Sequence, residues 1–202
     1  MGKMNLLKAN YEGKVGQTVG AKWKDKSTLR TLTKPADPKT AAQQSVRGVF
    51  GQMTTYIALF ADQIKYLNAL NTKGMSARNA IIKLNKAMIE SGTFTPADLI
   101  ISKGGLQKPT GFTAEKDSST NVVKVTWNEV TATNFSDKAK AVVVAVDEEQ
   151  QIVDVITADV SAKEAEGSLS FENATDVQVF LYFLDYRGSA KVASASVEAT
   201  IA

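Results

Sequence analysis

Residues 109–202 constrain the fold most, because short apolar runs alternate there with turn signals at even spacing. The runs are rich in Val, Ile, Phe and Tyr, and clusters of Gly, Ser, Asn and Asp separate them. Such a pattern is typical of an all-β sandwich. It predicts seven strands, at residues 111–115, 122–127, 141–146, 151–157, 168–171, 177–186 and 191–200.

The aromatic residues of this half suggest which kind of sandwich it is. Trp127 ends the second predicted strand, and residues 177–183 of the sixth form the most hydrophobic run. A tryptophan on an early strand that faces an aromatic-rich late strand resembles the core of a fibronectin type III or immunoglobulin-like domain. The chain has no cysteine, so the usual immunoglobulin disulfide is absent. This favours the fibronectin-like variant.

A long helix is predicted ahead of the sandwich. Asp37 is a suitable N-cap and Pro38 suits the first helical position. The apolar residues that follow are spaced alternately four and three apart, which is a heptad seam. We expect this helix seam to pack along a narrow stripe against another helix, and its residues are Val46, Phe50, Met53, Ile57, Phe60, Ile64 and Leu67.

A second helix, with Ser76 as N-cap and Gly92 at its end, can supply the partner for that seam. An antiparallel intramolecular hairpin is favoured over an intermolecular coiled coil, because three heptads lie at the lower limit of that signal. Gly48 and Gly51 fall off the seam. Each costs about 1 kcal/mol relative to alanine inside a helix, so a close contact or a bend is expected there.

Residues 11–33 predict a β-hairpin at the N-terminus. Apolar residues alternate with polar residues or glycine up to Trp23, and residues 28–33 predict the return strand. Gly16 and Gly20 then share one strand face. Glycine weakens a strand unless a bulge or a closely approaching backbone needs it, so we expect this face to pack tightly, with another chain as one option.

Charge divides the chain into two domains, residues 1–108 and 109–202. The first holds 17 Lys and Arg against 6 Asp and Glu, and the second holds 7 against 15. Residues 102–111 have the composition of a linker. The expected fold is therefore α+β: an N-terminal β-hairpin plus an antiparallel helical hairpin, followed by a seven-stranded fibronectin III/immunoglobulin-like β-sandwich.

Few kinds of catalysis are open to a chain without histidine and cysteine, although carboxylates, lysines or serines remain. The glycines of residues 13–20 do not make a phosphate-binding loop, because Ala21 and Lys22 stand where Gly-Lys-Ser/Thr is needed. Acidic residues around 147–159 offer oxygen ligands for calcium, but their spacing matches no known loop, so a solvated turn is favoured. We expect no cofactor, no metal site and no small-molecule substrate.

Basic residues cluster on the hairpin beside Trp23. They form a candidate interface for assembly or for an anionic partner, since cations next to an exposed aromatic can follow a phosphate backbone. The favoured alternative is that Trp23 belongs to the core and the lysines only protect an edge from aggregation. The candidate residues are Lys14, Gly16, Gly20, Lys22, Trp23, Lys24, Lys26 and Arg30.

Four features in order resemble an uncharacterised domain-of-unknown-function family that is frequent in Bacteroidetes-type bacteria and their bacteriophages. They are the hairpin GKVGQTVGAKWK, the helix with Gln43, Arg47 and Phe50, the junction SKGGL, and the terminal sandwich with its tryptophan. The resemblance spans nearly the full length. It implies the order of the folds and a phage or bacterial-surface context, and it supplies no catalytic residues.

The expected function is that of a non-enzymatic structural protein of a bacteriophage virion, at the capsid, neck or tail, made in the host cytoplasm. It would assemble in multiple copies through its N-terminal half, with itself and with other virion proteins, and head-to-tail assembly would use both charged halves. The alternative is a nucleic-acid-associated protein that binds DNA through the basic half. A carbohydrate-directed protein that uses Asp147 or Glu149 is a third class. No membrane span is expected, since no apolar run is long enough.

Overall fold

The computed structural model describes residues 13–23, 26–34, 36–63, 75–117, 120–131, 135–170, 176–187 and 190–201. The chain forms two compact units, Met1–Thr40 and Ala41–Ala202.

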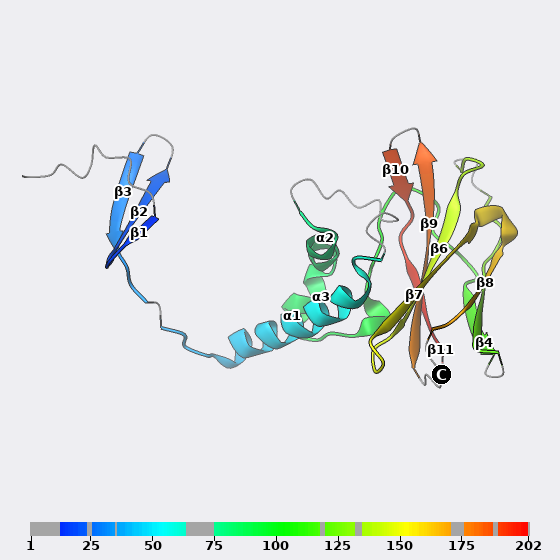
Figure 1. Ribbon diagram of the computed structural model, residues 1–202, viewed down its shortest axis with the longest axis horizontal. Coiled ribbons are helices and arrows are strands. Elements are labelled where there is room, and N and C mark those ends of the chain that lie inside the picture. Colours follow the sequence, from blue (N-terminus) through cyan, green and yellow to red (C-terminus); the bar gives the residue numbers. More distant parts are fainter. Residues whose placement is uncertain are drawn as a thin grey trace, which may run out of the picture. The chain divides into compact units, whose positions relative to one another are not determined.

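The first unit contains a three-stranded antiparallel sheet of β1 (Gly13–Val15), β2 (Thr18–Trp23) and β3 (Lys26–Thr31), coloured blue in Figure 1. The central strand β2 pairs with both neighbours. A return strand is present, as the sequence predicts. The predicted first strand, however, is split into β1 and β2.

The split lies at Gly16 and Gln17, which form a two-residue loop. Gly16 has a φ of 58°, and short hairpin loops need such positive angles, which glycine adopts without strain. Across this loop Lys14 pairs with Val19, so a lysine shares the strand face of Val19. The prediction of one unbroken alternating strand through residues 11–23 is therefore wrong.

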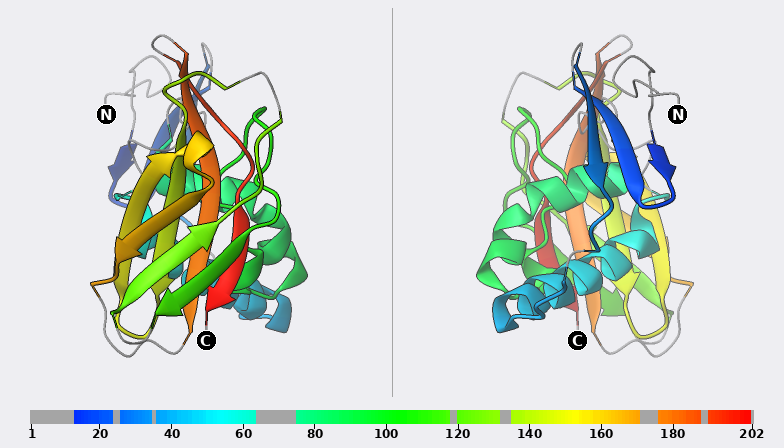
Figure 2. Two further views of the ribbon diagram at one scale, coloured as in Figure 1. Left: turned by 90° about the vertical axis from the view of Figure 1, so that its right-hand side faces the viewer. Right: turned by 90° about the vertical axis from the view of Figure 1, so that its left-hand side faces the viewer.

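The second unit has three layers, which Figures 1 and 2 show from different sides. The middle layer is a sheet in the order β10 (Ala190–Ala193), β9 (Val177–Arg187), β6 (Lys140–Asp147) and β7 (Ile152–Asp159), with β11 (Val197–Ile201) also paired to β9. A three-stranded sheet of β4 (Thr113–Asp117), β5 (Val122–Thr126) and β8 (Glu164–Ser168) covers one face. Helices cover the other face.

The described part of this unit has eight strands rather than the predicted seven, because the last predicted strand is interrupted. β10 pairs with residues 184–187 of β9, and β11 pairs with residues 177–181. Between them Ser194 Oγ accepts a hydrogen bond of 2.9 Å from Phe183 N. The fifth predicted strand, 168–171, is also displaced, because the observed strand is Glu164–Ser168.

The core between the two sheets confirms the predicted aromatic contact. Trp127 and Phe183 meet edge to face with ring centroids 6.0 Å apart. The indole Nε1 of Trp127 donates to Val160 O at 3.1 Å, which satisfies its polar group. Val123, Val125 and Leu181 fill the same layer.

The middle sheet is buried on both faces. Val142, Val144 and Phe180 point to the helices, while Val143 and Leu181 point to the three-stranded sheet. Both faces of β6 and β9 are covered, which explains why these strands are nearly continuous apolar runs.

Helix α1 (Ala41–Phe60) packs its C-terminal half on this sheet. Met53, Ile57 and Phe60 are fully buried with Val142, Val144 and Phe180. The helices that follow in the chain also contact α1, and Ile81 lies in the same buried cluster, so the predicted helical partner is confirmed. The sheet is a second partner, which the heptad spacing does not predict. The helix also begins later than predicted, because Lys39 has a φ of 46°, outside the helical range.

The second predicted helix is broken into α2 (Ala77–Leu84) and α3 (Lys86–Ser91). Its predicted ends are confirmed: Ser76 Oγ accepts from Asn79 N at 3.3 Å, and Gly92 is left-handed with a φ of 75°. The break is at buried Asn85. Its Nδ2 donates to Ile81 O at 2.9 Å and to Ile100 O at 2.8 Å, and its Oδ1 accepts from Ile100 N at 2.9 Å.

The predicted linker lies against the sheet. After the 3₁₀ turn η1 (Pro96–Asp98), Ser102 is fully buried and its Oγ donates to Ser194 O at 2.8 Å. Leu106 N donates to Ala193 O at 3.1 Å. The compact units are therefore divided after Thr40, and not at residue 108 as the charge pattern predicts, because the helices and the junction share a core with the sandwich.

Candidate assembly interface

One face of the N-terminal sheet carries a row of two cations around an apolar residue. Lys14, Val19 and Arg30 are direct neighbours on the three strands. Lys14 and Arg30 are exposed, and Val19 is half-buried. Neither cation has a carboxylate partner among the described residues. We call these three residues the basic row.

The opposite row consists of Gly13, Gly20 and Leu29, which are paired across the same strands. Leu29 is 44% exposed, and Gly20 is buried. Gly16 does not lie on this face. It is exposed in the turn, and a Cβ there would meet no atom within 4 Å, so the prediction that Gly16 packs closely on a strand face is wrong.

The remaining candidates of the hairpin cannot be placed in the same way. The side chains of Lys22, Trp23 and Lys26, and residue Lys24 as a whole, lie outside the described residues. Whether Trp23 belongs to a core or to a binding surface therefore stays a prediction.

This sheet has no core of its own in its described part. None of the buried hydrophobic side chains of the described chain comes from residues 13–34. A small sheet needs a hydrophobic face packed on something to be stable.

The helix seam is divided between core and surface. Met53, Ile57 and Phe60 are buried, whereas Val46 is 43% exposed and Phe50 46% exposed. Ile64 and Leu67 lie outside the described residues. Gly48 and Gly51 have open space where a Cβ would be, so the expected close contact at these glycines is absent from the described structure.

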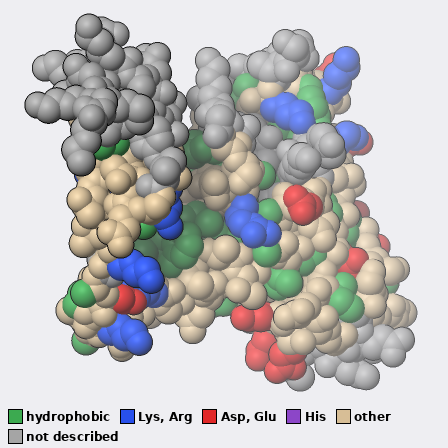
Figure 3. Space-filling model, turned by 60° about the vertical axis from the view of Figure 1, so that its left-hand side comes forward, with side chains coloured by type: hydrophobic (Ala, Val, Ile, Leu, Met, Phe, Trp, Pro, Cys, Tyr) green, Lys and Arg blue, Asp and Glu red, His purple; other side chains and the backbone are tan. Residues whose placement is uncertain are grey.

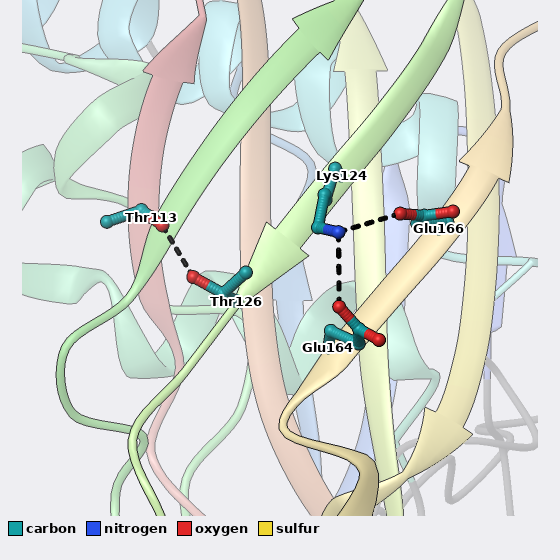
Figure 4. Close-up of polar contacts among 5 residues, drawn as sticks. All are labelled: Thr113, Lys124, Thr126, Glu164 and Glu166. Carbon is teal, nitrogen blue, oxygen red and sulfur yellow. Dashed lines mark hydrogen bonds and ion pairs between the residues drawn. The ribbon is translucent and has the colours of Figure 1, made fainter.

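The outer face of the three-stranded sheet is polar, and its central lysine is paired within the chain. Figure 4 shows the ammonium of Lys124 between Glu166 at 3.0 Å and Glu164 at 3.1 Å, and the hydroxyls of Thr113 and Thr126 at 2.7 Å. The hydrogen bonds to Glu166 and Glu164 raise the pKa of Lys124. One ammonium between two carboxylates leaves this cluster with a net negative charge.

Charged side chains are unevenly distributed over the surface, and on the face in Figure 3 acidic ones gather at the lower edge. Two carboxylates also line a depression of the second unit. Asp98, at the end of η1, and Glu198, on β11, lie there together with Ile100, which is 42% exposed, and Lys108. We call it the acidic depression. Burial, and then the charge of Asp98, raise the pKa of Glu198.

Sequence reasoning missed this surface, although one signal was present. Asp98 and Ile100 stand close together in the chain, but Glu198 comes next to them only through the pairing of β11 with β9 and the packing of β11 on η1. Long-range contacts of this kind have no local pattern in the sequence.

Three of the acidic residues considered for calcium have protein partners. Asp147 Oδ1 accepts from Gln150 N at 3.0 Å, Asp154 accepts from Ser170 N and Oγ at 2.6 and 2.7 Å, and Asp159 pairs with Lys140 at 2.6 Å. No group of three or more acidic side chains in the described part of the chain is arranged to hold a metal ion.

Buried titratable groups beneath the helices are structural. Tyr56 is 1% exposed, and its hydroxyl has no hydrogen-bond partner among the described residues. Burial, followed by the charges of Glu148 and Glu198, raises the pKa of this hydroxyl. The ring packs edge to face on Phe60 and Phe94, so Tyr56 contributes packing. No described helix is long and apolar enough to span a membrane.

Two solved structures similar to this chain have fibronectin type III domains in their descriptions. A Fn3-like protein from Clostridium thermocellum is 18% identical, with a TM-score of 0.32, over 50% of this chain and 94% of that chain. The FN1-FN3 domains of chicken CNTN1 are 10% identical, with a TM-score of 0.32, over 50% of this chain and 33% of that chain.

No curated protein matches this chain. The sequence profile of a family of unknown function covers nearly the whole chain, which confirms the expectation of an uncharacterised family. The match extends over residues 10–198, and the chain therefore belongs to the family of unknown function DUF6266.

Proposed function

We propose that this chain is a non-enzymatic structural protein that works in multiple copies, assembling through its N-terminal sheet and the exposed part of α1. The finer proposal is a bacteriophage virion component at the capsid, neck or tail, made in the host cytoplasm. The sandwich would then serve as a spacer or as an adhesive module.

The observation that carries this proposal is the absence of buried hydrophobic side chains in the described part of the N-terminal sheet. Strands of three to six residues bury too little surface alone to offset the cost of ordering the backbone, about 1–2 kcal/mol per residue. Contact with a partner would supply the missing burial.

The exposed stripe of α1 supports the same proposal. Val46 and Phe50 are four residues apart, so they lie on one side of the helix. Fully burying such a side chain is worth about 1.5–3 kcal/mol, so a partner that covers both would gain useful affinity. The neighbouring Gly48 and Gly51 leave room for close approach.

The virion context rests on the resemblance of the hairpin, helix and junction motifs to chains frequent in Bacteroidetes-type bacteria and their phages. Mass spectrometry of purified particles from the source tests it directly. A high copy number relative to known particle proteins supports this context, and absence from particles refutes it.

Assembly itself is tested by sedimentation velocity of the full chain over the micromolar range. We expect species larger than a monomer, which dissociate when Phe50 and Leu29 are both changed to Asp. Thr157→Asp, at an exposed position of β7, is the matched control and should assemble normally. A chain that stays monomeric at all concentrations would refute the proposal.

Nucleic-acid binding is the second candidate, because the basic row is exposed and residues 1–40 hold nine Lys and Arg against three Asp and Glu. Binding of duplex DNA that weakens steeply with added salt would support it. Lys14→Gln with Arg30→Gln should then reduce that salt dependence. Absence of binding at low salt would exclude it.

A further inference from the structure

The acidic depression lies on the second unit, where hydrogen bonds hold the backbone of Ile100. It has a volume of about 300 Å³, and Lys108 and Val197 also line it. The backbone N–H and C=O of Ile100 are both bonded to the side chain of Asn85, at 2.9 and 2.8 Å. Because buried Asn85 binds both backbone groups of Ile100, the side chain of Ile100 points to the surface, where it is 42% exposed.

The carboxylates of this depression are not neutralised within the described chain. No described cation lies within ion-pair distance of Asp98 or Glu198, although Lys108 lines the same depression. Glu198 Oε1 accepts a hydrogen bond only from the neutral hydroxyl of Thr200, at 2.9 Å. Repulsion between the two carboxylates would be relieved by an incoming cation.

The basic row of the N-terminal sheet carries the opposite charge and also includes an apolar residue. Two cations flank Val19 across three strands, and neighbouring strands lie about 4.8 Å apart, so the row spans roughly 10 Å. In the depression, two carboxylates accompany an exposed isoleucine. Apolar contact between Val19 and Ile100 would bring the two cations to the surface that holds the two carboxylates.

We infer that the acidic depression of one copy binds the basic row of a second copy, so that the assembly is head to tail. This inference rests on the proposed function and deepens it by naming the two surfaces. Such a contact joins different surfaces of the two copies, and it therefore produces rings or filaments rather than closed dimers.

Charge exchange in the full chain tests the inference. One double variant, Asp98→Lys with Glu198→Lys, makes the depression basic. The other, Lys14→Glu with Arg30→Glu, makes the row acidic. Each turns attraction into repulsion, so each variant alone should associate about tenfold more weakly than the wild type, because two exposed ion pairs are replaced by contacts between like charges.

An equimolar mixture of the two variants should restore association, because every row then meets a depression of opposite charge. The matched control, Asp62→Lys with Asp137→Lys, makes the same change in net charge at other exposed positions and should assemble like the wild type. Asp98→Asn with Glu198→Gln should give a smaller loss, and it covers the case in which the lysine variant does not fold. Circular dichroism establishes folding for every variant.

The outcomes separate this inference from the proposal beneath it. If the wild type assembles and the variants of the depression assemble equally well, the inference is wrong and the proposed function stands. If both variants dissociate but the mixture does not recover, the two surfaces do not bind each other. If the wild type is monomeric throughout, both the inference and the proposed function fail.

Discussion

Gly104 offers the sharpest test of the finding that residues 102–106 pack against the sheet at Ala193 and Ser194 instead of forming a linker. A Cβ on Gly104 would lie 1.9 Å from Ala193 O and 2.7 Å from its carbonyl carbon. Carbon and oxygen atoms that are not bonded need roughly 3.3 Å or more. Because the obstructing atoms belong to the backbone, no side-chain rotation can relieve the clash.

The size of the Gly104→Ala effect on stability can be estimated from the backbone shift that the Ala193 clash requires. Overpacking of this kind costs about 1–3 kcal/mol. The shift also endangers the hydrogen bonds from Leu106 N to Ala193 O and from Ser102 Oγ to Ser194 O, each worth about 1 kcal/mol. We expect a loss of about 3–5 kcal/mol in the free energy of unfolding, or roughly 6–20 °C in Tm.

The neighbouring residue provides the control. A Cβ on Gly105 would meet no atom within 4 Å, so Gly105→Ala should be neutral or stabilise by up to about 1 kcal/mol through the unfolded chain. Urea unfolding of both variants, followed by circular dichroism and tryptophan fluorescence, measures the difference. Equal urea midpoints for the two alanine variants would show that the backbones of Gly104 and Ala193 do not approach as closely as described.

Three further predictions concern the helices and the acidic depression. Asn85→Ala should cost about 2–4 kcal/mol, because it leaves both backbone groups of Ile100 without their partner, and the urea midpoint should fall. Met53→Ala should cost about 2–5 kcal/mol, whereas Phe50→Ala should change the stability of the monomer by under about 1 kcal/mol, so similar losses would contradict the division of the seam. The raised pKa of Glu198 means that the folded state holds its proton more tightly than the unfolded chain. Its contribution to stability therefore falls as pH rises from the ordinary glutamate range through the raised value. Glu198→Gln should then unfold at higher urea than the wild type at neutral pH and lose that advantage in acid, and a constant difference between the two would exclude this titration.

The sandwich and the ends of the second helical segment could be predicted because their signals are local. Caps at Ser76 and Gly92 depend on residues a few positions away, and the early tryptophan with an aromatic late strand is a pattern of spacing. The double-sided burial of the middle sheet also left a signal, since residues 141–146 and 179–184 are continuous apolar runs. Such runs indicate cover on both faces, but they do not show which element covers the second face.

Local sequence signals gave wrong predictions at two glycines, where the backbone conformation or a close backbone contact determines the structure. Gly16 stands at an alternating position, but its positive φ reverses the chain and changes which residues share a face. Residues 102–111 have a linker's composition, yet glycine is present at 104 because the backbone of Ala193 lies against it. A glycine required by close approach and one in a flexible linker are identical in sequence.

The sequence by itself determined the order of the elements, the sandwich, the ends of the second helical segment and the basic N-terminus, because each depends on composition or on short spacing. Only the tertiary structure decided that the helices share a core with the sandwich, that Val46 and Phe50 of the seam stay exposed, and that Glu198 joins Asp98 and Ile100. These contacts connect residues far apart in the chain. Their geometry depends on how β9 pairs with β6, β10 and β11 at once, and no local stretch specifies that pairing.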